Sequence, residues 1–287
     1  MDFFDLHCDT AYELYKRNLP FQNSSLSVTD KNNFDNWVQT FAVWIKDDTE
    51  NPFKLYQSII KDIKQKLKTA PENLTPLFAV EGGSVIENEI GHLEILKNDG
   101  IKMLTLTWNG ENAIAGGCKT DKGLTDFGAR VIKELNRLRI AADLSHLNRN
   151  SFYSAIEYAE YPIATHSNCF EICSHPRNLT NEQISLIAER QGVIGLTFYP
   201  EFLGENVFDK LYENILLLCD RGYENNIAIG SDFDGGKMNE SLDNISKIPT
   251  FHGFLEKKGL KPKLLNKIFY QNAYNFIAKL SERVYNN

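Results

Sequence analysis

The chain has 287 residues, of which 42% are hydrophobic and 24% charged, and its formal net charge at pH 7 is -7. This length fits one α/β barrel of about 250 residues as well as two smaller domains. Because nucleic-acid binding depends mainly on clustered Lys and Arg, an acidic chain with interspersed charges argues against a nucleic-acid partner.

The sequence also indicates a soluble protein with reduced thiols. The first predicted strand begins at residue 2 or 3, which leaves no room for a signal peptide, and no apolar run approaches the roughly 20 residues that span a bilayer. The five cysteines are an odd number without a CxxC pair, and we interpret Cys169 and Cys173 as structural thiols. We therefore expect a cytoplasmic protein without membrane attachment.

Short β-rich apolar segments alternate with longer segments of helical spacing. Eight segments are predicted to be strands: residues 3–6, 40–45, 77–80, 103–107, 140–144, 163–165, 193–198 and 227–230. Helix start signals stand at 51–52, 125–126 and 180–182, and the segment after Gly236 is predicted to form an eighth helix and a tail helix.

This alternation predicts an α/β fold with a parallel sheet. Eight strand-helix units in this length are typical of a (β/α)8 TIM barrel, which we expect to occupy residues 1–287 as a single domain with a C-terminal helical tail. A doubly wound open sheet is the alternative. No Pro/Gly/Ser-rich linker marks a domain boundary.

The first strand ends in the sequence Asp5-Leu6-His7-Cys8-Asp9. Because alternate residues of a strand share a face, His7 and Asp9 point the same way and Cys8 points to the opposite side. A lone His-x-Asp is more often a hydrogen-bonded pair than a metal site, so this segment needs support from elsewhere in the chain.

Three further strands also end in residues of metal-ligand type. Glu81 follows strand 77–80, where a buried carboxylate is costly unless it is paired or coordinated, and His146 and His166 follow the fifth and sixth strands. Five such residues at the same place on four strands predict a metal site. Imidazole and carboxylate ligands without thiolate suit zinc, with manganese and cobalt left open.

The eighth strand runs into Ser231-Asp232-Phe233-Asp234-Gly235 and brings acidic groups to the same edge. Either Asp232 or Asp234 could reach the site. An Asp-Gly pair is typical of a turn, so capping is the expected role of Asp234.

Taken together, these motifs resemble the membrane (renal) dipeptidases, which are binuclear zinc dipeptidases among the amidohydrolase-type barrels. The resemblance runs through nearly the whole chain and rests on DLHCDT at 5–10, AVEGG at 79–83, LTLTWNGEN at 104–112, DLSH at 143–146, ATHSN at 164–168, HPRNLT at 175–180 and IGSDFDG at 229–235.

The resemblance implies two Zn²⁺ per chain, one held by His7, Asp9 and Glu81 and the other by Glu81, His146 and His166. Glu81 would bridge the ions and is, with Asp232, an expected catalytic residue. Two cations about 3.5–4 Å apart need a shared anionic ligand and can activate a bridging water as hydroxide.

The resemblance also implies residues that contact the substrate. Arg177 matches the group that takes the terminal carboxylate of a dipeptide, and Asp232 matches the acid that passes a proton to the leaving amine. Where the mammalian relatives carry a histidine, this chain has Trp108, so Trp108, Asn109 or the zinc pair itself must serve the substrate oxygen. Phe198 and Tyr199 are expected to shape the side-chain pocket together with Trp108.

The expected function is therefore hydrolysis of dipeptides, including those with a D-residue at the C-terminal side, by a zinc-bridged hydroxide. One alternative is a mononuclear metal-dependent deaminase or amidohydrolase on the same barrel, but no Glu directly follows His146 as its proton shuttle. A catalytically inactive metal-binding barrel, damaged at Trp108, is the other. A homodimer is expected from the resemblance alone.

Overall fold

Eight parallel strands close into a barrel in the order of the chain. The computed structural model describes residues 1–27 and 34–281. The strands are β1 (Phe3–Cys8), β2 (Trp37–Trp44), β3 (Leu74–Glu81), β4 (Ile101–Thr105), β5 (Ala141–Asp143), β6 (Pro162–Ala164), β7 (Val193–Leu196) and β8 (Ile227–Ile229).

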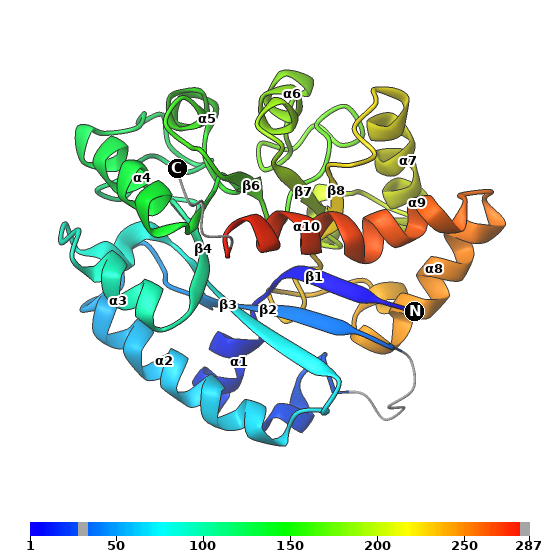
Figure 1. Ribbon diagram of the computed structural model, residues 1–287, viewed down its shortest axis with the longest axis horizontal. Helices are drawn as coiled ribbons and strands as arrows, with labels where there is room; N and C mark the ends of the chain where they lie inside the picture. The colour runs from blue at the N-terminus through cyan, green and yellow to red at the C-terminus, as the bar shows by residue number, and fades with distance from the viewer. Residues whose placement is uncertain (28–33, 282–287) are drawn as a thin grey trace, which may run out of the picture.

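Helices surround this barrel on the outside, as Figure 1 shows. They are α1 (Thr10–Arg17), α2 (Pro52–Lys66), α3 (His92–Asn98), α4 (Asp126–Leu138), α5 (Arg149–Ile156), α6 (Asn181–Glu189), α7 (Val207–Asp220) and α8 (Ile248–Lys257), followed by α9 (Pro262–Asn266), a π-helical turn (Lys267–Gln271) and α10 (Asn272–Lys279). The prediction of a (β/α)8 barrel with a helical tail is confirmed, and the open-sheet alternative is wrong.

The hydrophobic core has two layers. The larger layer lies between the strands and the surrounding helices. The smaller layer fills the barrel and alternates large side chains such as Phe4 and Met103 with alanines such as Ala42 and Ala228. The interior of the barrel is thus packed with side chains.

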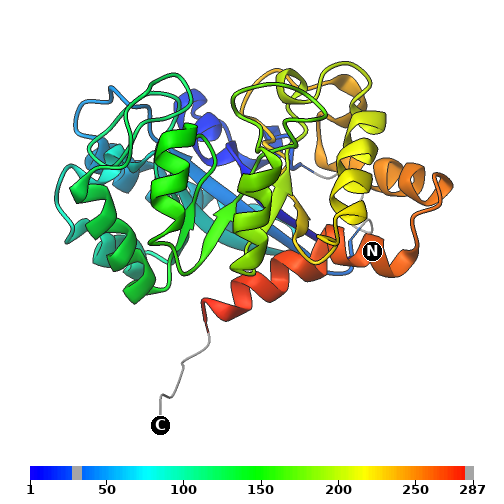
Figure 2. The same cartoon turned by 90° about the horizontal axis from the view of Figure 1, so that it is seen from above.

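The tail helix α10 covers one end of the barrel. Its buried residues Ala273, Phe276 and Ile277 belong to the same cluster as the interior side chains. In Figure 2 the tail helices run along one end of the barrel, and loops gather at the other. Since α10 covers the end where the strands begin, the carboxyl ends of the strands are left for a functional site.

The register of neighbouring strands sets the level of the side chains at that edge. Glu81 at the end of β3 pairs with Thr105 of β4, Thr105 pairs with Asp143 of β5, and Asp143 pairs with Ile163 of β6. Polar side chains from three adjacent strands are thereby brought to one level, directly below the loops.

Strand β1 carries one residue more than β2 between two paired positions, because Asp5 pairs with Gln39 but Cys8 pairs with Phe41. At this β-bulge Leu6 still packs inside the barrel, and its neighbour His7 also reaches the centre described below. Strict alternation would place these two side chains on opposite faces.

No helix within residues 1–27 and 34–281 has the combination of length and apolar character that crossing a membrane requires.

Candidate metal centre

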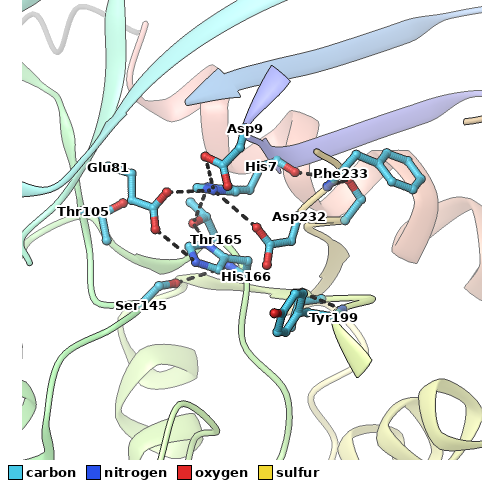
Figure 3. Close-up of polar contacts among 12 residues, drawn as sticks. His7, Asp9, Glu81, Thr105, Ser145, Thr165, His166, Tyr199, Asp232 and Phe233 are labelled. Carbon is cyan, nitrogen blue, oxygen red and sulfur yellow. Dashed lines mark hydrogen bonds and ion pairs between the residues drawn. The ribbon is translucent and has the colours of Figure 1, made fainter. Parts of the chain in front are cut away.

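Three imidazoles surround the carboxylate of Glu81 at the carboxyl ends of β1, β3, β5 and β6. His7 Nε2 lies 3.4 Å from Glu81 Oε2, whereas the Nε2 atoms of His146 and His166 lie 2.8 and 3.7 Å from Glu81 Oε1. All four side chains are buried. Figure 3 shows how Glu81 faces His7 and His166.

Two aspartates complete the centre on the side of His7. Asp9 Oδ1 lies 3.8 Å and Asp232 Oδ1 3.9 Å from His7 Nε2 (Figure 3). Backbone hydrogen bonds hold them there, because the Asp9 N–H donates to the Phe233 carbonyl and the Asp232 N–H donates to the His7 carbonyl. Two overlapping groups, His7–Glu81–His166 and His7–Asp9–Asp232, each bring their ligand atoms within 4.8 Å of one another.

The backbone takes unusual conformations where it delivers these side chains. His146 has φ 71° and Asp232 has φ 66°, both in the left-handed region that non-glycine residues rarely adopt. Directly after Glu81, Gly82 has φ 110°, and a Cβ there would lie 2.3 Å from the Ile45 carbonyl oxygen. Only glycine fits at that position, which explains the first Gly of the AVEGG motif.

The ring nitrogens that face away from Glu81 have oxygen partners of their own. His146 Nδ1 lies 2.9 Å from Asn109 Oδ1, and His166 Nδ1 lies 2.8 Å from Thr165 Oγ1. A proton on each Nδ1 leaves the lone pair of Nε2 directed at the centre, which is the usual arrangement of imidazoles that bind metal.

Several atoms of the centre are buried without a hydrogen bond. His7 Nε2, Asp9 Oδ1 and Glu81 Oε2 find no such partner within the described residues, and the Nε2 atoms of His146 and His166 lie only 2.8 Å apart. Unpaired buried acceptors of this kind are costly, and a cation between them would remove that cost. The donor set of imidazole nitrogens and carboxylate oxygens fits zinc.

In the absence of a cation, burial and the neighbouring carboxylates shift the pKa values of the side chains in the centre. Burial opposes the charged form of His7, but the nearby carboxylates of Asp9 and Glu81 outweigh it and raise the pKa of His7 well above its ordinary value. Burial, and then the charge of Asp9, raises the pKa of Asp232 well above its ordinary value. Burial lowers the pKa of His146 and of His166, so these two imidazoles remain neutral.

A cavity of about 290 Å³ opens onto the centre. Its lining includes the ligand-type residues Asp9, Glu81, His146 and Asp232 and all four predicted substrate-binding residues, Trp108, Asn109, Arg177 and Tyr199. The structure thus brings the predicted metal-ligand, catalytic and substrate-binding residues to one place, with His7 and His166 buried behind the cavity wall.

Arg177 is the buried cation of this cavity. Its side chain is only 4% exposed, Nη2 donates to the His166 carbonyl at 3.2 Å, and Nε finds no partner within the described part of the chain. The guanidinium lies 5.2 Å from the centre of the Phe202 ring. Lys119 lines the same cavity and adds a positive charge to it.

The aromatic residues divide between the cavity and the core. Trp108 lines the cavity with its ring 5.1 Å from that of Trp44 and 6.4 Å from that of His146. Tyr199 lines it too, but the expectation for Phe198 is wrong: Phe198 is buried against Phe233 and Phe251. Phe198 and Tyr199 are adjacent in the loop after β7, and of the two Tyr199 lines the cavity whereas Phe198 packs in the core.

Two buried aspartates that sequence reasoning did not assign hold the frame of the centre. Asp5 accepts hydrogen bonds from Ser231 N and Oγ of the β8 end and from Gln39 Nε2, and Asp143 accepts from Ser145 N and Thr165 N. Asp5-Leu6 directly precedes His7, and Asp143-Leu144 precedes His146 with Ser145 between them, and this shared Asp-Leu pair is the signal that could have identified them.

Asp234 stays outside the centre. Its carboxylate accepts from the Thr10 hydroxyl at 2.6 Å and from the Ser25 N–H at 3.2 Å. It therefore joins the loop after β8 to α1 and to the following segment, in agreement with the structural role expected for it.

Residues 40–284 match the family described as membrane dipeptidase (peptidase family M19). A Klebsiella pneumoniae relative, an uncharacterized protein in the pqqA 5' region, is 29% identical over 209 residues, which are 67% of this chain and 77% of that protein. An uncharacterized dipeptidase of Schizosaccharomyces pombe is 29% identical over 221 residues, which are 73% of this chain but only 54% of that protein.

A solved structure of similar fold is a metallopeptidase from Rhodobacter sphaeroides, liganded with a phosphinate mimic of the dipeptide L-Ala-D-Ala. It superposes with a TM-score of 0.86 over 98% of this chain and 99% of its own, at 20% sequence identity. At that identity the likeness supports the barrel fold.

Proposed function

The chain belongs to the membrane dipeptidase family, peptidase family M19, and on that premise we propose that it is a metal-dependent dipeptidase that uses two zinc ions. The observation that carries the proposal is the convergence of three imidazoles on the Glu81 carboxylate, with the carboxylates of Asp9 and Asp232 beside His7 and several of these atoms buried without hydrogen bonds.

Glu81 would serve both ions because its two oxygens face different imidazoles. Oε2 faces His7, which with Asp9 would hold one zinc, and Oε1 faces His146 and His166, which would hold the other. When bound, such a pair supplies a hydroxide nucleophile at neutral pH and polarises the scissile carbonyl.

The other cavity residues would bind and orient the substrate. Arg177 would take the terminal carboxylate of the dipeptide, since its guanidinium lines the cavity and its Nε has no hydrogen-bond partner within the described residues. This grip limits the substrate to one residue beyond the scissile bond. Trp108 and Tyr199 would contact side chains, and Asn109, whose Oδ1 faces His146, could offer only its amide N–H groups.

Asp232 would move the proton that the leaving amine needs. Its carboxylate lies beside His7 and Asp9 and lines the cavity, so it faces both the centre and the substrate. A carboxyl group that holds a proton in this environment can deliver it to the nitrogen as the peptide bond breaks.

We propose further that a D-residue is accepted at the C-terminal side. Support comes from the structurally similar Rhodobacter sphaeroides protein, which was solved with a mimic of L-Ala-D-Ala. A mononuclear deaminase fits the site less well, because Glu81 stands between imidazoles on both sides and Leu147, not Glu, follows His146.

A panel of L-L and L-D dipeptides, followed by amine release, tests this function together with elemental analysis. We expect two zinc equivalents per chain and turnover that disappears in Glu81→Ala. In Asp232→Asn we expect a fall of about 100-fold or more in kcat with both metals retained.

The controls separate the alternatives. One metal equivalent with turnover of an aminated heterocycle would favour the deaminase. Two metals without turnover of any dipeptide would favour the inactive metal-binding barrel, and either result would contradict the dipeptidase proposal.

A further inference from the structure

The hydroxyl of Thr165 lies between two of the three imidazoles of the centre. Its Oγ1 is 2.8 Å from His166 Nδ1 and 3.4 Å from His7 Nδ1, and the residue is fully buried (Figure 3). The proposed function assigns these histidines to different zinc ions. One side chain therefore contacts a ligand of each ion from behind.

The single proton of this hydroxyl is donated to the carboxylate of Asp143. Thr165 Oγ1 lies 2.7 Å from Asp143 Oδ2, which also accepts from Thr105 Oγ1 at 2.6 Å. The second oxygen, Asp143 Oδ1, accepts the N–H groups of Ser145 and Thr165, each at 3.0 Å. Four donors are directed at the two oxygens of Asp143, which accept from each of them, so the Thr165 proton points toward Asp143.

The hydroxyl can consequently act only as an acceptor toward the two imidazoles. Each of them must carry its proton on Nδ1, which leaves the Nε2 lone pair free on the side of Glu81. His146 is independent of this arrangement, because its Nδ1 faces Asn109 Oδ1 instead.

We propose that Thr165, oriented by Asp143, is a positioning residue that fixes the metal-binding tautomer of one histidine in each half of the binuclear centre. This inference rests on the proposed two-metal function. Its consequence is that loss of one hydroxyl weakens both zinc sites at once, although Thr165 itself touches neither ion.

Zinc titration of Thr165→Val against a chelating indicator tests the proposal without reference to activity. Val has the shape of Thr but no hydroxyl, and loss of such outer partners lowers metal affinity by about 10–100-fold. We expect a loss of this size at both sites in Thr165→Val and near wild-type affinities in Thr165→Ser.

Thr40→Val is the matched control. Thr40 on β2 is equally buried, and its hydroxyl has no hydrogen-bond partner within the described residues. This variant should bind two zinc ions like the wild type. Weakening of only one site in Thr165→Val, or equal weakening in Thr40→Val, would overturn the proposal.

Imidazole ¹⁵N spectra of the metal-free wild-type protein in alkaline solution give a second test. This test does not depend on whether a substituted protein folds. His7 and His166 should both be Nδ1–H tautomers there. An Nε2–H tautomer in either ring would overturn the assignment. A wild-type protein that binds one zinc would contradict the two-metal function instead, and the spectra would still decide the role of the hydroxyl.

Discussion

In its proposed role, the buried side chain of Arg177 would by itself limit substrate size. Its guanidinium is almost completely enclosed, it is held by the His166 carbonyl, and burial lowers its pKa from the ordinary value. Its Nε has no hydrogen-bond partner within the described residues, and enclosing such a cation is costly, so a carboxylate that enters the cavity gains a strong partner.

We therefore predict that Arg177→Lys lowers kcat/KM by about 10–100-fold, chiefly through KM, because a charged hydrogen bond contributes about 1.5–3 kcal/mol. Steady-state kinetics on a dipeptide measure this change. The same dipeptide with an amidated C-terminus should respond little, since it has no carboxylate for Arg177 to bind.

Lys119→Ala is the control for general positive charge, because exposed Lys119 lines the same cavity. We expect a change of less than about threefold, as is usual for exposed charges. An equal effect of the two substitutions would mean that the cavity attracts anions without a specific contact from Arg177.

Acidification should release the metals. Burial disfavours a charged His7, but Asp9 and Glu81 more than offset this and raise its pKa well above the ordinary value. As the pH falls, His7 in the metal-free centre therefore takes up a proton earlier than a free imidazole does, and that proton competes with zinc for Nε2. Apparent zinc affinity, measured between about pH 8 and pH 5, should fall steadily as the pH decreases. A constant affinity across this range would argue against imidazole ligands.

Among the elements, α10 is the one whose removal we expect to affect the barrel most. Phe276 of α10 is 3% exposed and packs with the side chains inside the barrel, whereas Tyr274 on the same helix is 48% exposed. We predict that Phe276→Ala costs about 3–5 kcal/mol in the free energy of unfolding.

Tyr274→Ala should cost about 1 kcal/mol, because that ring only stacks on Tyr270 at the surface. Urea unfolding of the metal-free variants gives both values. Equal costs would show that α10 does not seal the barrel interior.

The elements that could be predicted from the sequence are those fixed by local pattern. Strand ends carrying Glu81, His146 and His166 follow from apolar runs interrupted by polar residues. The β1 bulge beside His7 and the π-helical turn at Lys267–Gln271 could not be predicted, because packing against other strands decides them.

The partners behind the ligands were also beyond prediction. Asp143 and Thr165 are recognisable as polar residues at strand ends, but the direction of a hydroxyl proton depends on which acceptor lies next to it in space. That Phe198 packs in the core and does not line the cavity was missed for a related reason. The structure ends β7 at Leu196, and the loop after it decides which side chain faces the cavity.

For the whole molecule, metal binding and stability should be linked. Zinc at 100 times its dissociation constant stabilises the folded state by about 2.7 kcal/mol per site, and two sites should raise Tm by about 10 °C in a chain of this size. Calorimetry with and without chelator measures the shift. Glu81→Ala should show little response to chelator, and a chelator effect of wild-type size in that variant would place the metals elsewhere.

Helix α10, which closes the N-terminal end of the barrel, also limits the routes by which small molecules reach the cavity. Side chains pack the barrel interior and α10 lies across the N-terminal ends of the strands, so the described part of the chain leaves no passage through the barrel. A dipeptide substrate and the two amino acids released from it would then enter and leave through the same opening of the cavity. If Arg177 holds the terminal carboxylate as proposed, the amino acid that it still binds would block the next dipeptide, and we predict product inhibition.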